Sequence, residues 1–187
     1  MQKRHTDRES YFGEQSQTSK NYYIPYIKEV IGHIPDKVLE VGCGEGGNLL
    51  PFAEAGCRVM GVDIDATRIE QARTFFAQRH QQGQFIATDI FQLKDKATNF
   101  PLILLHDVIE HIRDKERFLS GLQKHLSADG AIFVGFPAWQ MPFGGHQQIA
   151  HSHIVSHFPF LHLLPRTLYR WILRPVSYTH LTLPTIR

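Results

Sequence analysis

Residues 38–47 read VLEVGCGEGG, a short apolar run followed by closely spaced glycines, and this stretch decides the fold. The apolar run predicts a buried strand, and Leu49, Leu50 and Phe52 predict a helix after the glycines. Glycines let a backbone approach a ligand closely, and the first turn of a helix presents unpaired N–H groups. A strand, a glycine turn and a helix in this order are typical of a nucleotide-binding site, although such a turn can also serve only to join strand to helix.

The glycine spacing fits two nucleotide-binding templates. Gly42, Gly44 and Gly47 match the dinucleotide pattern G-x-G-x-x-G, whereas Gly42, Gly44 and Gly46 match the tighter pattern G-x-G-x-G of S-adenosylmethionine enzymes. The turn by itself leaves both interpretations open.

Short runs rich in β-branched residues alternate with amphipathic stretches on either side of the turn. The runs cover residues 38–41, 58–64, 84–88, 102–105 and 131–136. Strands that are linked by helical crossovers form a parallel sheet covered on both faces. We therefore predict a doubly wound α/β fold, Rossmann-like, with strand order 3-2-1-4-5.

The chain has 187 residues, enough for one domain with a full core. We expect a polar, loosely ordered N-terminal segment over residues 1–18 and one domain over residues 19–175. Residues 176–187 show no periodicity and are interpreted as a non-native tail. No further strand is evident after Phe136, so we expect the sheet to be incomplete at the C-terminus.

The amino-acid composition indicates which classes of partner to expect. The formal net charge is +2 and the basic residues are scattered, so no nucleic-acid partner is expected and a small or neutral substrate is favoured. Cys43 and Cys57 lack metal-type spacing and suit a reducing compartment.

Neither a signal peptide nor a membrane-spanning run is evident, so we expect a cytoplasmic protein without stable membrane insertion. An apolar helix at 161–173 is expected to cover the sheet, with association with a membrane surface as the alternative.

Acidic residues follow the second and third predicted strands. Asp63, in the segment GVDID, lies about twenty residues after the turn, where a carboxylate accepts hydrogen bonds from ribose hydroxyls in either nucleotide class. Asp65 is expected to cap the next helix. Asp89, in the segment ATDI, is suited to accept a hydrogen bond from an adenine amino group, which favours the S-adenosylmethionine template, and a turn cap is its alternative role.

A fourth segment, HDVIEHI at residues 106–112, follows the fourth predicted strand, beside the first strand at the point where the strand order reverses. With VLEVGCGEGG, GVDID and ATDI, it makes residues 20–137 resemble the class I S-adenosylmethionine-dependent methyltransferases. Within them, the chain resembles the small-molecule group that includes ubiquinone-biosynthesis O-methyltransferases. The resemblance implies S-adenosylmethionine as the cofactor and transfer of its methyl group to a small-molecule acceptor, for which a hydroxyl is one option.

The resemblance also implies roles for individual residues. It assigns to cofactor binding Glu40, Gly42, Cys43, Gly44, Gly46, Asp63, Ile64, Asp89, Ile90, His106 and Val108. In that assignment the glycine turn lines the methionine part and the ribose, and Glu40 orients the turn and the methionine amino group. Asp63 holds the ribose, and Ile64, Asp89 and Ile90 surround the adenine. His106 and Val108 border the methyl donor.

Methyl transfer from a sulfonium is an in-line displacement, so catalysis rests mainly on positioning the acceptor. A hydroxyl acceptor also needs a base, and histidine has a suitable pKa. His111 is the first candidate, and His146, in the segment FGGHQ, is the second. Their alternative roles are to fill a helix start and to hold a loop. No metal is predicted from the histidine-rich segment, because no acid or cysteine joins its histidines.

Two other functions remain open at this point. One is an NAD-dependent oxidoreductase, which would use the glycine turn and Asp63 but leaves Asp89 and residues 106–112 unexplained. The other is a non-catalytic fragment that binds S-adenosylmethionine.

Overall fold

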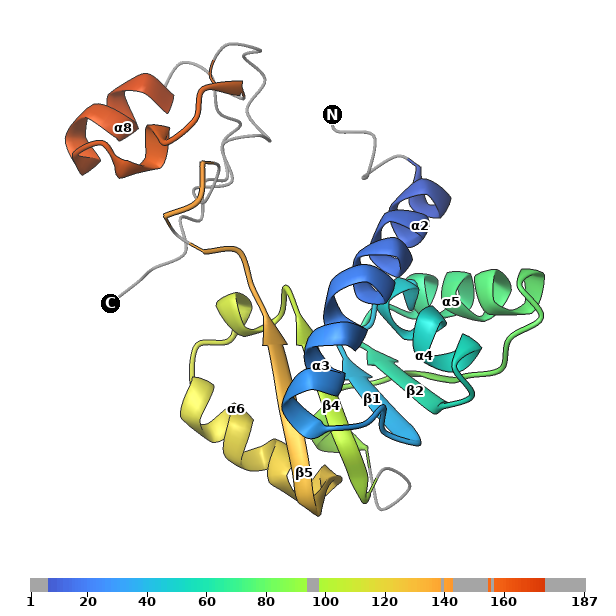
Figure 1. Cartoon of the computed structure of the whole chain (residues 1–187). Helices are drawn as coiled ribbons and strands as arrows, with labels where there is room; N and C mark the ends of the chain where they lie inside the picture. Colours follow the sequence, from blue (N-terminus) through green and yellow to red (C-terminus); the bar gives the residue numbers. More distant parts are fainter. Residues whose placement is uncertain (1–6, 94–97, 139, 143–154, 156, 174–187) are drawn as a thin grey trace. The chain divides into compact units, whose positions relative to one another are not determined.

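The computed structural model describes residues 7–93, 98–138, 140–142, 155 and 157–173. Its centre is a parallel sheet (Figure 1). The strands are β1 (Lys37–Val41), β2 (Arg58–Asp63), β3 (Gln84–Ala87), β4 (Phe100–His106) and β5 (Leu126–Gly135). They lie in the order β3-β2-β1-β4-β5, and every neighbouring pair is parallel. This confirms the predicted doubly wound class and strand order, with the reversal between β1 and β4.

The last strand is longer than its apolar run predicts. β5 begins at Leu126, which pairs with Phe100, and the register then shifts so that Ala131 pairs with Leu102. The residues between Leu126 and Ala131, Gly130 among them, belong to this irregular part of the strand. Backbone pairing needs no apolar side chain, which is why the sequence pattern missed this half of β5.

Alternating residues of each central strand enter two separate cores. Val38 belongs to the core under the helices α3 (Ile24–Ile31), α4 (Leu50–Glu54) and α5 (Ala66–Gln78). Leu39 belongs to the opposite core, with Phe118 and Leu122 of helix α6 (Lys115–Leu122). Because both faces are covered, the two central strands, β1 and β4, are buried along most of their length.

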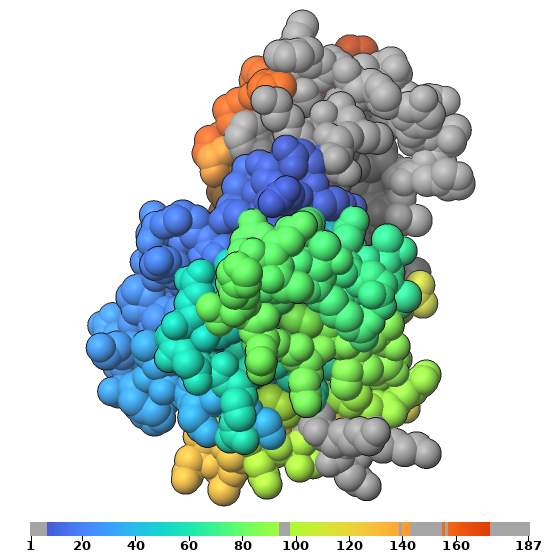
Figure 2. Space-filling model, turned by 90° about the vertical axis from the view of Figure 1, so that its right-hand side faces the viewer, coloured from blue at the N-terminus to red at the C-terminus, as the bar shows by residue number. Residues whose placement is uncertain are grey.

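Within the N-terminal segment, residues 8–18 are helical, not loosely ordered as expected. Helix α2 (Arg8–Thr18) begins at Asp7, whose carboxylate accepts a hydrogen bond from the Ser10 N–H at 2.9 Å. Phe12 is completely buried, with ring centroids 5.0 Å from Phe75 and 6.4 Å from Phe76. Figure 2 shows α2, in dark blue, against α5, in green. A single aromatic anchor and a cap are sufficient to hold a segment whose composition is otherwise polar.

Helix α2 continues into α3 through a wide turn, η1 (Ser19–Tyr23), with π-helical hydrogen bonds. The Ile24 N–H donates to the Ser19 carbonyl, five residues earlier, and Pro25 follows in the first turn of α3. Proline has no N–H to donate, and a first-turn position tolerates this.

Single turns of 3₁₀ helix occupy the loops. They are η2 (Gly47–Leu49), η3 (Ile90–Gln92), η4 (Ile109–His111), η5 (Gln123–His125) and η7 (Leu161–Leu163).

The chain divides after Phe136 into two compact units. In the second unit, Leu161 and Tyr169 are buried together, and helix α8 (Arg166–Leu173) follows Pro165, so the apolar helix expected at 161–173 is interrupted there. Within the part of the chain that the structure describes, no helix is long and apolar enough to cross a membrane. The domain bounds 19–175 and the tail 176–187 stay predictions, because residues 174–187 lie outside the described part.

Candidate functional site

The glycine turn joins β1 to η2 at the carboxyl edge of the sheet. Gly42, Gly44 and Gly46 have positive φ angles of 74°, 52° and 81°. The N–H groups of Gly42 and Cys43 both donate to the Val62 carbonyl, at 2.7 and 3.1 Å, which ties the turn to β2. The left-handed glycines are those of the G-x-G-x-G pattern, whereas Gly47 begins η2.

Close packing also requires glycine at two positions of this turn. A Cβ on Gly42 would lie within 3.0 Å of Val108 Cγ2, and one on Gly46 would lie 2.9 Å from the Phe85 ring. A Cβ on Gly44 would meet only Arg68, at 3.7 Å. Gly44 is therefore the glycine beside which the chain leaves the most space.

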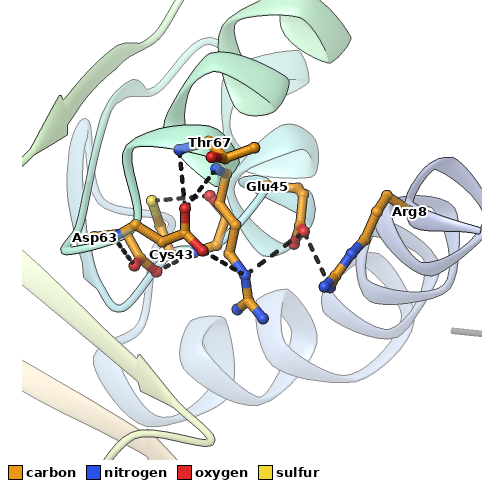
Figure 3. A network of polar contacts seen from close by, with 8 residues as sticks. Arg8, Cys43, Glu45, Asp63 and Thr67 are labelled. Carbon is orange, nitrogen blue, oxygen red and sulfur yellow. Dashed lines mark hydrogen bonds and ion pairs between the residues drawn. The ribbon is translucent and has the colours of Figure 1, made fainter. Parts of the chain in front are cut away.

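Asp63 is held by the turn that it faces (Figure 3). Its Oδ2 accepts a hydrogen bond from the Gly44 N–H at 2.8 Å, and its Oδ1 accepts one from the Asp65 N–H at 2.9 Å. Asp65 caps α5 through a 2.9 Å hydrogen bond from the Thr67 N–H, as predicted. Two backbone donors thus orient the Asp63 carboxylate at the end of β2 without a cationic side chain in hydrogen-bond contact.

Glu40, near the end of β1, is a fully buried carboxyl group. Its Oε1 accepts a hydrogen bond from Asn48 Nδ2 at 2.8 Å, and its Oε2 has no hydrogen-bond partner among the described residues. The pKa of Glu40 is raised to about 8, mainly by burial and in part by the nearby Asp63 charge, while the hydrogen bond from Asn48 opposes the rise. Glu40 is therefore mostly protonated at neutral pH, and its Oε2 is a buried polar atom that the described residues leave unpaired.

Asn48 is a site residue that the sequence analysis missed. It is buried, and its backbone carbonyl accepts a hydrogen bond from Ser19 Oγ at 2.8 Å. No motif marks an asparagine in this turn as a partner of Glu40, so only the folded chain shows this contact.

Cys43 has a structural position. Its Sγ lies where it would meet a Cβ on Gly61 of β2 at 2.6 Å, so the thiol packs against a glycine in that strand. Burial raises the pKa of the Cys43 thiol well above its usual value, and Glu40 and Asp63 add to this. The thiol remains protonated, so it does not serve as a nucleophile.

The N-terminal helix packs against the back of the turn. Glu45, which is 1% exposed, lies 3.2 Å from Arg8 of α2 and 3.9 Å from Arg68 of α5 (Figure 3). A Cβ on Gly47 would lie 2.7 Å from the Phe12 carbonyl oxygen. The turn is therefore enclosed by a helix that the sequence analysis placed outside the domain.

A second group of residues lies at the end of β4, next to β1. His106 ends the strand, and Asp107 adopts a left-handed backbone with φ 54°, which is strained for a residue with a side chain. His106 Nδ1 lies 3.7 Å from Asp107 Oδ2, and the Tyr23 ring is centred 5.6 Å from the His106 ring. Val108, the next residue, packs on Gly42. Both predicted members of this group thus lie beside the glycine turn.

Tyr23 is the second site residue that the sequence analysis missed. Its pKa is raised to about 12, mainly by burial and in part by the charges of Asp107, Glu40 and Tyr11. The phenol therefore stays protonated at neutral pH. The only sequence signal at Tyr23 is the helical spacing of the apolar residues around it, and that spacing indicates a helix but no functional role.

The other residues predicted for cofactor binding or catalysis do not form one group. Ile64 is 82% exposed after β2, whereas Ile90 is 4% exposed and belongs to the core beside α6. Asp89 caps η3 through a 2.9 Å hydrogen bond from the Phe91 N–H, which is the alternative role considered for it. His111 is exposed in η4, and His146 lies outside the described residues. Among the residues that the structure describes, no three His, Cys, Asp or Glu side chains form a group that could hold a metal ion.

Fold and site together define a Rossmann-like α/β protein with a glycine turn and an oriented carboxylate, Asp63, at the carboxyl edge of its sheet. A family model described as a methyltransferase domain matches residues 39–132, half of the chain, and the chain belongs to this family. The assignment favours a methyltransferase over the oxidoreductase alternative.

Curated proteins of similar sequence support this family assignment. The chain is 33% identical over 118 residues to the ubiquinone biosynthesis O-methyltransferase of Bartonella quintana. The matched region covers 60% of this chain and 48% of that protein. It is 34% identical over 98 residues to the protein of the same name from Brucella ovis, with 52% and 40% covered. The chain thus spans about half the length of the curated relatives that it matches.

Solved structures show the same fold. PKMT2 from Rickettsia typhi, in complex with AdoHcy, is 28% identical with a TM-score of 0.57, over 70% of this chain and 27% of that one. The plantazolicin methyltransferase BpumL, in complex with a monoazolic desmethylPZN analog and SAH, has a TM-score of 0.57 at 22% identity, with 71% and 50% covered.

Proposed function

We propose that this chain binds S-adenosylmethionine at the carboxyl edge of its sheet and transfers the methyl group to a small-molecule acceptor. One observation carries the proposal, namely the Asp63 carboxylate oriented by the Gly44 N–H beside a left-handed glycine turn. The family of the chain and the AdoHcy complex of the Rickettsia typhi relative support it.

The residues present fit the chemistry of this cofactor. Asp63 would accept hydrogen bonds from the ribose hydroxyls, and the space beside Gly44 would admit the ligand. The buried Oε2 of Glu40 would accept the methionine ammonium group. At the adenine end, Ile64 is the more exposed of the two isoleucines, and Asp89 would offer its carboxylate to the amino group.

When bound, the cofactor supplies an electrophilic methyl group on a sulfonium. The chain then has to orient the acceptor and exclude water, because in-line displacement depends on alignment. His106, Val108 and Tyr23 border this space, and the neutral Tyr23 phenol would donate a hydrogen bond there. For a hydroxyl acceptor, His111 remains the first candidate base and His146 the second.

Calorimetry with S-adenosylmethionine, AdoHcy and NAD tests the binding part. We expect micromolar binding of the first two and none of NAD, and the opposite pattern would restore the oxidoreductase alternative. Asp63→Asn should weaken AdoHcy binding about tenfold or more, because it replaces a charged acceptor for two hydroxyls. Asp36→Asn is the matched control, since Asp36 is exposed and precedes the opposite end of β1.

Turnover is tested separately with labelled donor and pools of small-molecule acceptors. His111→Ala should lower turnover and leave donor binding unchanged, whereas the exposed His33→Ala should change neither. Unchanged turnover in His111→Ala would remove this histidine from the mechanism. Donor binding with no turnover on any acceptor would favour the non-catalytic alternative.

We also propose that residues 161–173, which include helix α8, associate with a membrane surface. Leu168 and Trp171 are 43% and 73% exposed, and the basic residues Arg166 and Arg170 lie on the same helix. Apolar and basic side chains together bind anionic lipid surfaces. Flotation with anionic vesicles should carry the chain along and should fail for Trp171→Ala, and equal flotation of both would contradict this role. A cytoplasmic location stays a prediction.

A further inference from the structure

A cavity of about 340 Å³ opens at the amino ends of the strands, away from the glycine turn. Its lining includes the first residues of three strands, Lys37 of β1, Arg58 of β2 and Gln84 of β3. The turn and Asp63 follow the carboxyl ends of β1 and β2, so the cavity lies at the opposite edge of the sheet. Its volume falls within the range of small-molecule sites, which begins at about 300 Å³.

The floor of the cavity is apolar and well buried. Val59, Met60 and Phe100 contribute to the lining and are each at most 5% exposed, because they also belong to the cores of the sheet. Such a floor suits the flat or aliphatic body of an organic ligand.

The rim of the cavity carries two cations. The Lys37 ammonium lies 3.9 Å above the centre of the Phe100 ring and donates a hydrogen bond to the Thr98 carbonyl at 2.8 Å. Arg58 pairs with Asp36 at 2.9 Å, and both side chains are about three-quarters exposed. Asp36 thus offsets only one of the two cations by a direct ion pair, which leaves positive charge at the mouth of a cavity with an apolar floor.

The positive charges of Lys37 and Arg58 repel each other. Burial lowers the pKa of Lys37, the charge of Arg58 lowers it further, and Asp36 partly offsets both. An anion between the two side chains would relieve this repulsion.

We propose that this cavity binds a small organic anion, with an apolar body on Val59, Met60 and Phe100 and a carboxylate between Lys37 and Arg58. The amides of Gln82 and Gln84, which are exposed at the same rim, would complete the hydrogen bonding of the carboxylate. This site is independent of the proposed methyl transfer, because it uses none of the same residues.

Benzoate is the probe, and the full chain is the protein tested. Titration followed by NMR should show millimolar binding of benzoate and much weaker binding of both benzyl alcohol, which lacks the charge, and inorganic phosphate, which lacks the apolar body. Binding of either as tight as that of benzoate would overturn the assigned ligand class. AdoHcy should not compete with benzoate, and competition would place benzoate at the other edge of the sheet.

Substitutions at the rim give the second test. Arg58→Gln should weaken benzoate binding about tenfold, the effect of losing one charge-assisted hydrogen bond, whereas Arg117→Gln, on α6, should leave it unchanged. Asp36→Asn should strengthen binding, because it frees Arg58 from its partner. These side chains are exposed, so the variants should fold. Equal benzoate affinity in wild type and Arg58→Gln would overturn the proposal.

Discussion

Gly42 and Gly56 have similar left-handed backbones, with φ of 74° and 87°, but different surroundings. A Cβ on Gly42 would clash with Val108, whereas one on Gly56 would meet nothing within 4 Å. We expect Gly56→Ala to lower the free energy of unfolding by about 1 kcal/mol, from backbone strain alone. Gly42→Ala should lower it by about 3 kcal/mol, because overpacking adds to the strain. Urea denaturation of both variants measures the difference.

Val108 supplies the control for this comparison. In the Gly42→Ala background, Val108→Ala removes the clashing methyl groups and should recover part of the lost stability. If Gly42→Ala and Gly56→Ala are equally destabilised, the contact with Val108 contributes nothing to the need for glycine.

Glu40 makes the free energy of unfolding depend on pH. Its pKa is about 8 in the folded chain and about 4.3 in an unfolded one, so between these values the folded state retains a proton that the unfolded state releases. Stability should therefore fall as the pH rises from about 4.5 to 8 and level off above. Glu40→Gln, which mimics the neutral form, should exceed wild type by a few kcal/mol at pH 9 and match it at pH 5.

Thermal unfolding between pH 5 and 9 measures this dependence. The exposed Glu54→Gln is the control and should follow wild type throughout. A stability difference between Glu40→Gln and wild type that stays constant with pH would mean that Glu40 does not titrate in this range.

The same carboxyl group predicts proton release when the proposed cofactor binds. A ligand ammonium group near the Glu40 Oε2 favours the carboxylate, so binding near pH 7 should release protons and tighten as the pH approaches 8. Calorimetry with AdoHcy in buffers of different ionisation enthalpy counts the protons. Release should disappear in Glu40→Gln, and wild-type enthalpies that do not depend on the buffer would contradict the prediction.

At the scale of elements, α2 is held mainly by Phe12. Its ring is completely buried against Phe75 and Phe76, and the Arg79 guanidinium lies 4.5 Å from its centre. Phe12→Ala should cost about 3 kcal/mol or more and remove hydrogen-exchange protection over residues 8–18. AdoHcy binding should also weaken, because α2 packs behind Gly47.

Tyr22, which is 69% exposed in the same helical run, provides the matched control. Tyr22→Ala should leave both exchange protection and AdoHcy binding unchanged. Retained protection of residues 8–18 in Phe12→Ala would show that the ion pair between Arg8 and Glu45 is sufficient to hold the helix.

The sequence predicted elements well where burial follows a simple period. The strands from β1 to β4 and helix α5 combine apolar patterns with clear caps and turns. The pattern failed for α2, which is held by the ring contacts of Phe12 and by ion pairs, and for the first half of β5, which is held by backbone pairing. None of these contacts leaves a periodic signal in the sequence.

On the scale of the whole molecule, both cores of the sheet lie between Asp7 and Phe136. We therefore expect a fragment of residues 7–138 to unfold cooperatively and to bind AdoHcy as the full chain does. Circular dichroism melting and calorimetry of the fragment and the full chain compare the two. A fragment that fails to fold, or that binds AdoHcy at least about tenfold more weakly, would mean that the second unit stabilises the first.

By itself, the sequence determined the sheet class, the strand order, the glycine turn and the positions of Asp63 and Val108. These follow from local patterns, because strand periodicity, glycine spacing and residues at strand ends are all written within a few positions. Only the tertiary structure decided the protonation of Glu40 and the places of Asn48 and Tyr23. Burial and contacts between distant segments set these properties, and neither depends on the neighbouring residues in the chain.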